Sequence, residues 1–208
     1  MAAIHVVRHG ETVWHAENRY AGVSEVPLTE RGREQALVLA GWARRSGVDR
    51  VVASDLSRAV LTAGPAAEAL GVDVETDPRL REVNFGAGEG LTRAEMARRF
   101  PAELERFLAA PATCPLPGGE SGTDAARRAL EALLELATAP GGDVLVVAHS
   151  TLLRLVLCSA LRVDPDRYRE LFPRLDNVTV TTLVPTTGRW ALLRYNAAVG
   201  DRTEEGRP

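Results

Sequence analysis

The sequence lacks the features that mark several classes of protein. It has two cysteines, Cys114 and Cys158, which form neither a disulfide framework nor a metal-ligand spacing. No apolar run is long enough to span a bilayer, and no basic segment precedes a signal-type apolar core. The net charge of −3 provides no basic excess for nucleic acid or an acidic membrane. We therefore expect a cytoplasmic protein with reduced thiols and with neither nucleic acid nor membrane as a partner.

The familiar phosphate-binding motifs are missing as well. The chain has no GxxxxGK[ST] loop, and the glycines within residues 86–90 do not complete a dinucleotide fingerprint. No cluster of carboxylates is present that would hold magnesium, so we expect neither a metal nor a cofactor. A phosphate bound to this chain would have to be neutralised by side chains alone.

What the sequence does contain is an alternation of short apolar strands and amphipathic helices. Its 208 residues suit a single domain, 1–208. The expected strands cover residues 3–7, 51–53, 72–76, 144–147, 178–184 and 190–195. The expected helices cover about 29–47, 57–70, 92–100, 101–108 and 123–137, and a last one ends near 161. This order predicts an α/β fold whose mostly parallel sheet has an antiparallel edge strand.

Two further segments are expected to lie outside this alternation. Residues 86–122 are interpreted as a short helical insertion rather than a second domain, because short helical patterns alternate there with proline- and glycine-rich loops. Residues 197–208 are polar and are expected to form a mobile tail.

Three of the predicted strands end in similar polar residues. Arg8 and His9 end the first, Arg58 follows the second after a short loop, and His149 follows the strand at 144–147. Since the carboxyl ends of parallel strands share one edge of a sheet, these side chains should meet there and bind a phosphate. Taken singly, Arg58 suits a surface ion pair and His149 a structural role equally well. Their combination favours the phosphate site.

Chemistry assigns separate roles to these residues. A neutral His9 is the most economical nucleophile towards phosphorus, and a cationic His149 would stabilise charge on the transferring phosphoryl group. A leaving alkoxide needs a proton, and Glu82, in the loop after the third strand, is the candidate general acid. On its own, Glu82 would be interpreted as an exposed loop acid.

Arg8-His9-Gly10-Glu11-Thr12 resembles the RHG signature of the histidine phosphatase superfamily, also called the phosphoglycerate-mutase-like family. The resemblance spans nearly the whole chain and includes, in order, residues 27–29, 54–59, 80–82, 118–121 and 147–149. It implies a three-layer α/β/α sandwich with no metal and, as is common in the family, a dimer. It also implies a phosphohistidine intermediate on His9, a phosphoryl group bound by Arg8, Arg58 and His149, and Glu82 as proton donor.

The chain departs from the family pattern at two positions. His15 stands where the family usually has an asparagine whose amide holds the phosphate, and its imidazole could donate in the same way, point into the substrate site or lie at the surface. Ser150 replaces the glycine that usually follows the second catalytic histidine. Its N–H can still face the phosphate, and its hydroxyl can cap the next helix.

Within the family the choice lies between hydrolysis and phosphoryl transfer. Mutases resemble this chain but have a longer, more basic insertion and a tail that shields the phosphoenzyme, whereas this insertion is short and residues 200–208 have no apolar anchor. We therefore predict a phosphatase, with mutase activity as the alternative and a non-catalytic phosphoryl-binding scaffold as the alternative of another class. The cavity walls are expected from residues 19–24, which include Gly22, and from Phe85 and the insertion, in particular Leu104, Phe107 and Leu108. They suggest a small phosphorylated substrate.

Overall fold

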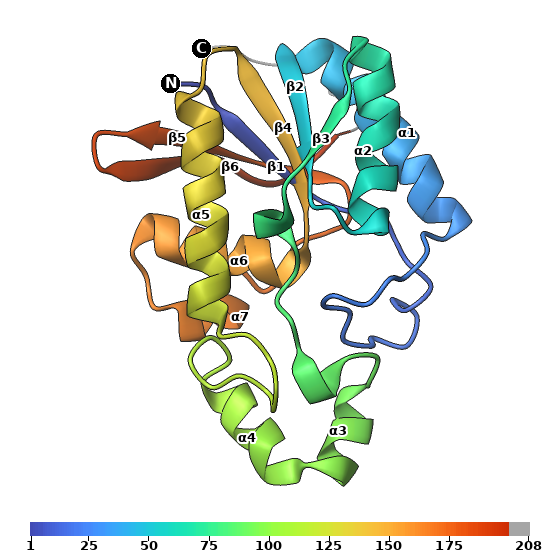
Figure 1. The fold of residues 1–208 in the computed structure, drawn as a ribbon, viewed down its shortest axis with the longest axis vertical. Coiled ribbons are helices and arrows are strands. Elements are labelled where there is room, and N and C mark those ends of the chain that lie inside the picture. Colours follow the sequence, from blue (N-terminus) through green and yellow to red (C-terminus); the bar gives the residue numbers. More distant parts are fainter. Residues whose placement is uncertain (200–208) are drawn as a thin grey trace.

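A computed structural model describes residues 1–199, which are arranged around one six-stranded sheet (Figure 1). The strands are β1 (Ile4–Arg8), β2 (Val48–Ala53), β3 (Val74–Thr76), β4 (Asp143–Ala148), β5 (Thr179–Thr186) and β6 (Arg189–Ala198). They lie in the order β3-β2-β4-β1-β5-β6. The first four pair in parallel, whereas β5 pairs antiparallel with both β1 and β6. The predicted α/β class and its antiparallel edge are confirmed.

Helices cover both faces of the sheet and make the fold a three-layer sandwich, as Figure 1 shows. They are α1 (Glu30–Ser46), α2 (Ser57–Leu70), α3 (Arg93–Arg99), α4 (Pro101–Ala109), α5 (Gly122–Thr138), α6 (Ser150–Leu161) and α7 (Tyr168–Leu171). Helices α1 and α2 cover one face, and α5 and α6 cover the other. Alternate strand residues enter the two cores: Val6 packs on the α5–α6 side and Val7 on the α1–α2 side. Burial of both faces explains the continuous apolar runs of these strands.

Local capping fixes several helix ends where the sequence predicts them. The Thr29 hydroxyl accepts a hydrogen bond from the N–H of Gly32 and starts α1, and Gly47, with φ of 80°, ends it in the left-handed conformation. Thr92 and Glu95 form the predicted capping box at the start of α3. The short helix α7 and the turn before it were not expected, because they have no hydrophobic periodicity long enough to show in the sequence.

The expectation that the tail begins at about 197 is wrong. Strand β6 continues through Ala198, because Ala197 and Ala198 pair with Val180 and Thr179 of β5. This pairing uses backbone groups, which leave no pattern in the side chains. The remainder of the expected tail, residues 200–208, lies outside the described residues.

The insertion at 86–122 contains a 3₁₀ turn at Gly86–Gly88 and helices α3 and α4, and it lies at one end of the molecule in Figure 1. Leu104 and Phe107 of α4 are buried in the same core as Phe85. The insertion is therefore packed onto the domain through its own apolar side chains.

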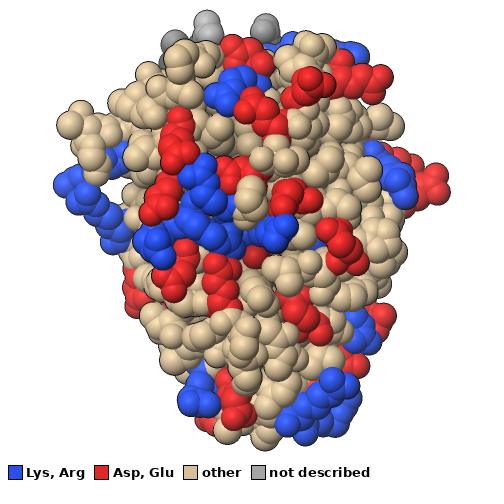
Figure 2. All heavy atoms as spheres, in the orientation of Figure 1, with Lys and Arg blue, Asp and Glu red and all other residues tan. Residues whose placement is uncertain are grey.

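The surface shows acidic and basic side chains in close alternation. On the face in Figure 2, basic side chains gather across the middle and acidic ones border them. Several of these charges form ion pairs, among them Arg79 with Asp77 and Glu135. Within residues 1–199 no helix is both long and apolar enough to cross a membrane.

Candidate active site

Two of the predicted site histidines, His9 and His149, directly follow neighbouring strands of the sheet. Arg8, the last residue of β1, is in register with Ala148, the last residue of β4. The N–H of His9 donates to the Ala148 carbonyl at 3.0 Å, and the imidazole rings of His9 and His149 lie 5.2 Å apart between centroids. The parallel pairing of β1 with β4 therefore brings together two residues that are 140 positions apart in the sequence.

Gly10 allows the chain to pass close to α1 just beyond His9. A Cβ atom at this position would lie 2.5 Å from the carbonyl oxygen of Gly32. The N–H of Gly10 donates to the hydroxyl of Thr62 in α2 at 2.9 Å. The glycine of the RHG motif is thus required by backbone contact, and it fixes the direction in which His9 leaves the strand.

His9 has the protonation state that a nucleophile needs. Its Nδ1 lies 2.7 Å from the carbonyl oxygen of Gly10, and since a carbonyl only accepts, Nδ1 holds the proton. The other ring nitrogen, Nε2, is then free of a proton. Burial, followed by the charges of Arg58 and Arg8, lowers the pKa of His9 well below its usual value. A neutral ring with an available Nε2 lone pair is suited to attack phosphorus.

Arg8 and Arg58 are held by main-chain carbonyls and not by carboxylates. Nη1 of Arg8 donates to the Leu175 carbonyl at 2.8 Å. The terminal nitrogens of Arg58 donate to carbonyls of the first loop, those of Ala21, Gly22 and Ser24. Burial lowers the pKa of Arg8 to about 10, so it remains a cation at neutral pH. The Nε atoms of both arginines are buried and have no hydrogen-bond partner in the described part of the chain.

His149 is fully buried, and neither of its ring nitrogens has a hydrogen-bond partner among the residues that the structure describes. Burial and the nearby Arg58 and His9 lower its pKa well below the usual value, which favours the neutral ring. A bound dianion would oppose these effects by attracting a proton to the ring. The predicted cationic role of His149 therefore applies to the complex with phosphate, and for that state it stays a prediction.

Glu82 lies against the start of α6. Its Oε1 accepts the N–H groups of Val83 and Leu152 at 2.9 and 2.7 Å, and its Oε2 accepts that of Thr151 at 2.9 Å. The carboxyl group thus takes two of the N–H groups that the first turn of α6 leaves unpaired. Each oxygen retains further capacity for a proton or a hydrogen bond. Glu82 also lines the cavity that contains His9, so its predicted role as proton donor is geometrically accessible.

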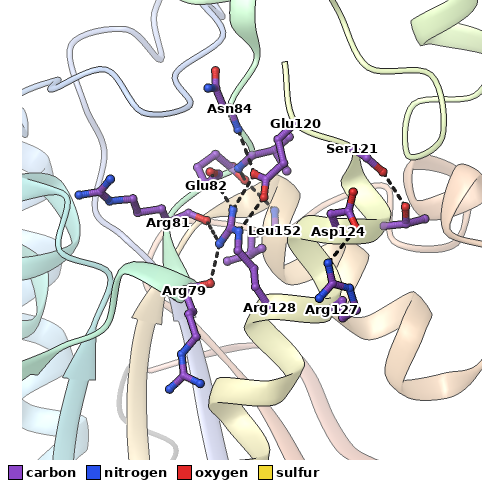
Figure 3. A network of polar contacts seen from close by, with 12 residues as sticks. Arg79, Arg81, Glu82, Asn84, Glu120, Ser121, Asp124, Arg127, Arg128 and Leu152 are labelled. Carbon is purple, nitrogen blue, oxygen red and sulfur yellow. Dashed lines mark hydrogen bonds and ion pairs between the residues drawn. The ribbon is translucent and has the colours of Figure 1, made fainter. Parts of the chain in front are cut away.

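Arg128 of α5 holds the segment that delivers Glu82 (Figure 3). Its guanidinium donates to the carbonyl oxygens of Arg79, Arg81 and Glu82 at 2.5, 2.8 and 3.2 Å. The same group forms a two-pronged ion pair with Glu120, at 2.7 and 2.8 Å. These contacts satisfy three carbonyls of an irregular segment and fix the position of Glu82.

His15 lies between Arg8 and Thr12. Its Nε2 lies 2.6 Å from Nη2 of Arg8 and 3.2 Å from the side-chain nitrogen of Asn177, and both of these groups are donors. Its Nδ1 accepts the Thr12 N–H at 3.0 Å and lies 2.8 Å from the Thr12 hydroxyl. Both ring nitrogens therefore face hydrogen-bond donors, which favours the neutral ring, and burial with the charge of Arg8 lowers its pKa to about 4. Because both nitrogens already accept hydrogen bonds, these contacts do not support the expected donation from His15 to phosphate, and that donation stays a prediction.

A cavity of about 620 Å³ opens beside His9. Among the predicted site residues, those that line it are Arg8, His9, His15, Glu82, Phe85 and Ser150. Arg58 and His149 are not lining residues, since both are fully buried.

Some of the expected cavity walls lie elsewhere. The N–H of Gly22 donates to the carboxylate of Glu89, its carbonyl accepts from Arg58, and a Cβ there would lie 2.0 Å from that carboxylate. Gly22 therefore shapes the loop and is not a lining residue. Leu104 and Phe107 are buried in the core, so the insertion reaches the cavity through 92–94 instead.

Several lining residues were not found from the sequence. Arg154 belongs to α6, and Tyr168 and Arg169 belong to α7. Arg154 follows Ser150 by four positions, and this helical spacing places both on one face above the strand ends. That spacing was an available signal. Tyr168 and Arg169 had none, because α7 has only four residues.

Comparisons with known proteins agree with this geometry. Residues 4–198 match the profile of the histidine phosphatase superfamily (branch 1). The protein named probable phosphoglycerate mutase GpmB of Yersinia pestis is 34% identical over 193 residues, which are 91% of this chain and 88% of that protein. Among solved structures, Bacillus stearothermophilus YhfR superimposes with a TM-score of 0.88 at 28% identity, covering 95% and 98% of the two chains. A mycobacterial glucosyl-3-phosphoglycerate phosphatase superimposes with a TM-score of 0.84 at 30% identity, covering 95% and 100%. The chain belongs to the histidine phosphatase superfamily.

Proposed function

We propose that this protein is a metal-independent phosphomonoesterase that hydrolyses a small phosphorylated metabolite through a phosphohistidine at His9. One observation carries the proposal. Besides the free Nε2 of His9, four buried nitrogens of the candidate site have no hydrogen-bond partner within residues 1–199, namely Nε of Arg8, Nε of Arg58 and both ring nitrogens of His149. Buried polar groups are rarely left unpaired in native proteins. A phosphoryl dianion would accept hydrogen bonds from several of them at once.

The reaction proceeds in two displacements at phosphorus. Nε2 of His9 attacks, the bond between phosphorus and the ester oxygen breaks, and Glu82 gives its proton to the leaving alkoxide. Water then attacks the phosphohistidine, Glu82 takes a proton from that water, and inorganic phosphate leaves with the Nε2–phosphorus bond broken. Arg8, Arg58 and His149 stabilise charge on the phosphoryl group in both steps.

Phosphoryl transfer between two positions of a sugar acid is the second candidate. The observation that favours it is the mutase name of the Yersinia relative. Hydrolysis is favoured by the composition of the cavity wall, where the exposed Glu17, Asn18 and Arg93 give water access to the phosphohistidine. A mutase has to protect that intermediate from water.

A rapid-quench experiment tests the proposal, in which the reaction with a ³²P-labelled ester is stopped without acid. The wild-type protein, with EDTA present, should accumulate an acid-labile, base-stable phosphoryl group and release one inorganic phosphate per ester consumed. His9→Ala should do neither. Conversion of 3-phosphoglycerate to 2-phosphoglycerate with little phosphate release would establish the mutase instead. Phosphate binding without turnover would indicate a scaffold.

Two broader expectations accompany this proposal. A homodimer, which the family resemblance implies, is to be tested by sedimentation velocity. A cytoplasmic location is supported by Cys114 and Cys158, both of which are free thiols.

A further inference from the structure

The wall of the cavity formed by α6 and α7 contains two arginines that both lie against one aromatic ring. The guanidinium carbon of Arg154 lies 4.8 Å from the centroid of the Tyr168 ring, and that of Arg169 lies 5.2 Å from the same centroid. Arg169 also lies 4.9 Å from the ring of Phe107. Tyr168 is only 1% exposed, so its ring is a fixed support for both cations. All three of Arg154, Tyr168 and Arg169 line the cavity that contains His9.

Neutral groups hold these two guanidiniums. Nε of Arg154 donates to the Ser150 carbonyl at 3.2 Å, and Nε of Arg169 donates to the Tyr168 hydroxyl at 3.0 Å. Within the part of the chain that the structure describes, neither forms an ion pair with a carboxylate. Arg19, on the same cavity, is different, because it pairs with Glu17 at 2.7 Å and Glu95 at 2.9 Å. Stacking on aromatic rings orients a guanidinium but leaves its charge uncompensated.

The charges around the cavity do not balance if the ligand is a phosphoryl group alone. That group would be bound by Arg8, which lines the cavity, and by the fully buried Arg58, whose charge acts on His9. The two acids that line the cavity are already occupied, Glu17 by Arg19 and Glu82 by the N–H groups of α6. Within the described residues, Arg154, Arg169 and the exposed Arg93 would then remain without an anion, and of these only Arg154 and Arg169 are oriented by aromatic rings.

We propose that Arg154 and Arg169 form a second anion subsite, and that the substrate is a phosphomonoester with a further carboxylate or phosphate group. This inference rests on the proposed phosphatase function and narrows its substrate class. The planar guanidinium fork suits either anion, because both present paired oxygen acceptors. The distance between the subsite and His9 then sets how far apart the two anionic groups of the substrate lie.

Matched esters of graded length test the proposal. The series consists of ω-phosphooxy alkanoates of two to five carbons, the ω-phosphooxy alkanols of the same lengths and the corresponding alkane bisphosphates. Inorganic phosphate release gives kcat/KM for each. The wild type should prefer the charged member at one length by about tenfold, the factor expected for a hydrogen bond to a charged group. Whether the alkanoate or the bisphosphate shows the greater preference identifies the second anion.

Three variants assign the preference to the subsite. Arg154→Gln and Arg169→Gln should each reduce the ratio of charged to neutral ester at least fivefold, and Arg154→Lys should restore part of it. Arg167→Gln is the matched control, because Arg167 precedes α7 and pairs with Glu170 outside the cavity. It removes one nearby charge and should leave the ratio within twofold of the wild type.

The remaining outcomes each overturn a stated claim. If the wild type hydrolyses the neutral esters without preferring any charged member, the second subsite does not exist and the phosphatase proposal stands. If Arg154→Gln lowers kcat/KM equally for both members of a pair, Arg154 contacts the reacting phosphoryl group and the subsite is wrongly assigned. If no ester releases phosphate, the phosphatase proposal fails and this inference fails with it.

Discussion

The strand-end residues Arg8, His9, Arg58 and His149, here called the floor, hold their arginines differently from the α6–α7 wall of the cavity. In the floor, Arg8 and Arg58 donate to main-chain carbonyls, so the fold itself fixes their positions. On the wall, Arg154 and Arg169 rest on aromatic rings and are partly exposed. Carbonyl anchors permit one geometry, whereas stacking tolerates sliding and rotation of the guanidinium. The floor is therefore suited to one chemical step, and the wall to selecting what surrounds the phosphate.

Replacement of His9, the proposed nucleophile, is the strongest test of this difference between the floor and the wall. His9→Ala should lower kcat by at least about a thousandfold for every ester, because the covalent route disappears and only binding remains. Initial rates with p-nitrophenyl phosphate and one alkyl phosphate provide the measurement. His5→Gln is the control, since His5 lies in the same strand but bonds Thr182 on β5. Substantial turnover by His9→Ala would place the attacking group elsewhere and remove the distinction between floor and wall.

The next largest effect should depend on the leaving group. Glu82→Gln keeps the size of the side chain but has no proton to give, so hydrolysis of an alkyl phosphate should fall about 10²- to 10⁴-fold. Hydrolysis of p-nitrophenyl phosphate, whose phenolate leaves without a proton, should fall far less. A plot of log kcat/KM against leaving-group pKa measures the change in slope, because kcat/KM reports the first displacement and excludes the later attack by water that all esters share. Equal losses for good and poor leaving groups would show that Glu82 acts by holding α6 and not as an acid.

The floor could be predicted from the sequence to a greater extent than the wall. Arg8, His9 and His149 end apolar strands, and parallel strand ends meet at one edge, so their proximity follows from the pattern alone. Arg128 and Asn177 also support the floor, but they do so largely through backbone carbonyls, which leave no trace in the sequence. In the wall, Tyr168 and Arg169 belong to α7, whose four residues are too few for a helical period, whereas Arg154 could have been found from its spacing to Ser150.

The same reasoning explains where the fold predicted from the sequence is right and where it is wrong. The buried strand at 144–147 was placed to within one residue, because a continuous apolar run has one simple interpretation. The end of β6 was misplaced because edge pairing is decided by backbone hydrogen bonds with β5. Leu104 and Phe107 were expected to line the cavity because the sequence cannot tell which apolar residues of an insertion face its own core.

A smaller effect on activity is expected when the support that Arg128 gives to Glu82 is removed. Arg128→Met removes the donors to three carbonyls while keeping much of the packing, so Glu82 should lose its fixed position. We expect kcat for an alkyl phosphate to fall about tenfold, with a lesser loss for p-nitrophenyl phosphate, the pattern of a weakened general acid.

The adjacent residue offers a control for that prediction. Arg127→Met removes an exposed arginine of the same helix, whose partners are Asp124 and Glu131, and it should leave both rates unchanged. If Arg128→Met lowered only the melting temperature, or lowered both rates equally, Arg128 would support the fold and have no part in positioning the acid.

The smallest expected effect concerns His15, which joins the floor to the first loop. Its pKa is about 4 in the folded protein and near 6.5 when unfolded, so between these values the unfolded chain binds more protons. The free energy of unfolding should therefore fall as pH decreases from 6.5 towards 4. Because the ring is half-buried and screened by solvent, we expect His15 to account for about 1 kcal/mol of that fall.

Urea unfolding of the wild type and His15→Asn at pH 7.0, 5.5 and 4.5 isolates this contribution. His9 and His149 also have lowered pKa values, but they are present in both proteins and largely cancel in the difference. The wild type should lose more stability than the variant as pH falls, because a protonated His15 can no longer accept the Arg8 hydrogen bond and repels its charge. Parallel curves for the two proteins would mean that His15 does not hold Arg8. The floor would then depend only on the backbone carbonyls that distinguish it from the wall.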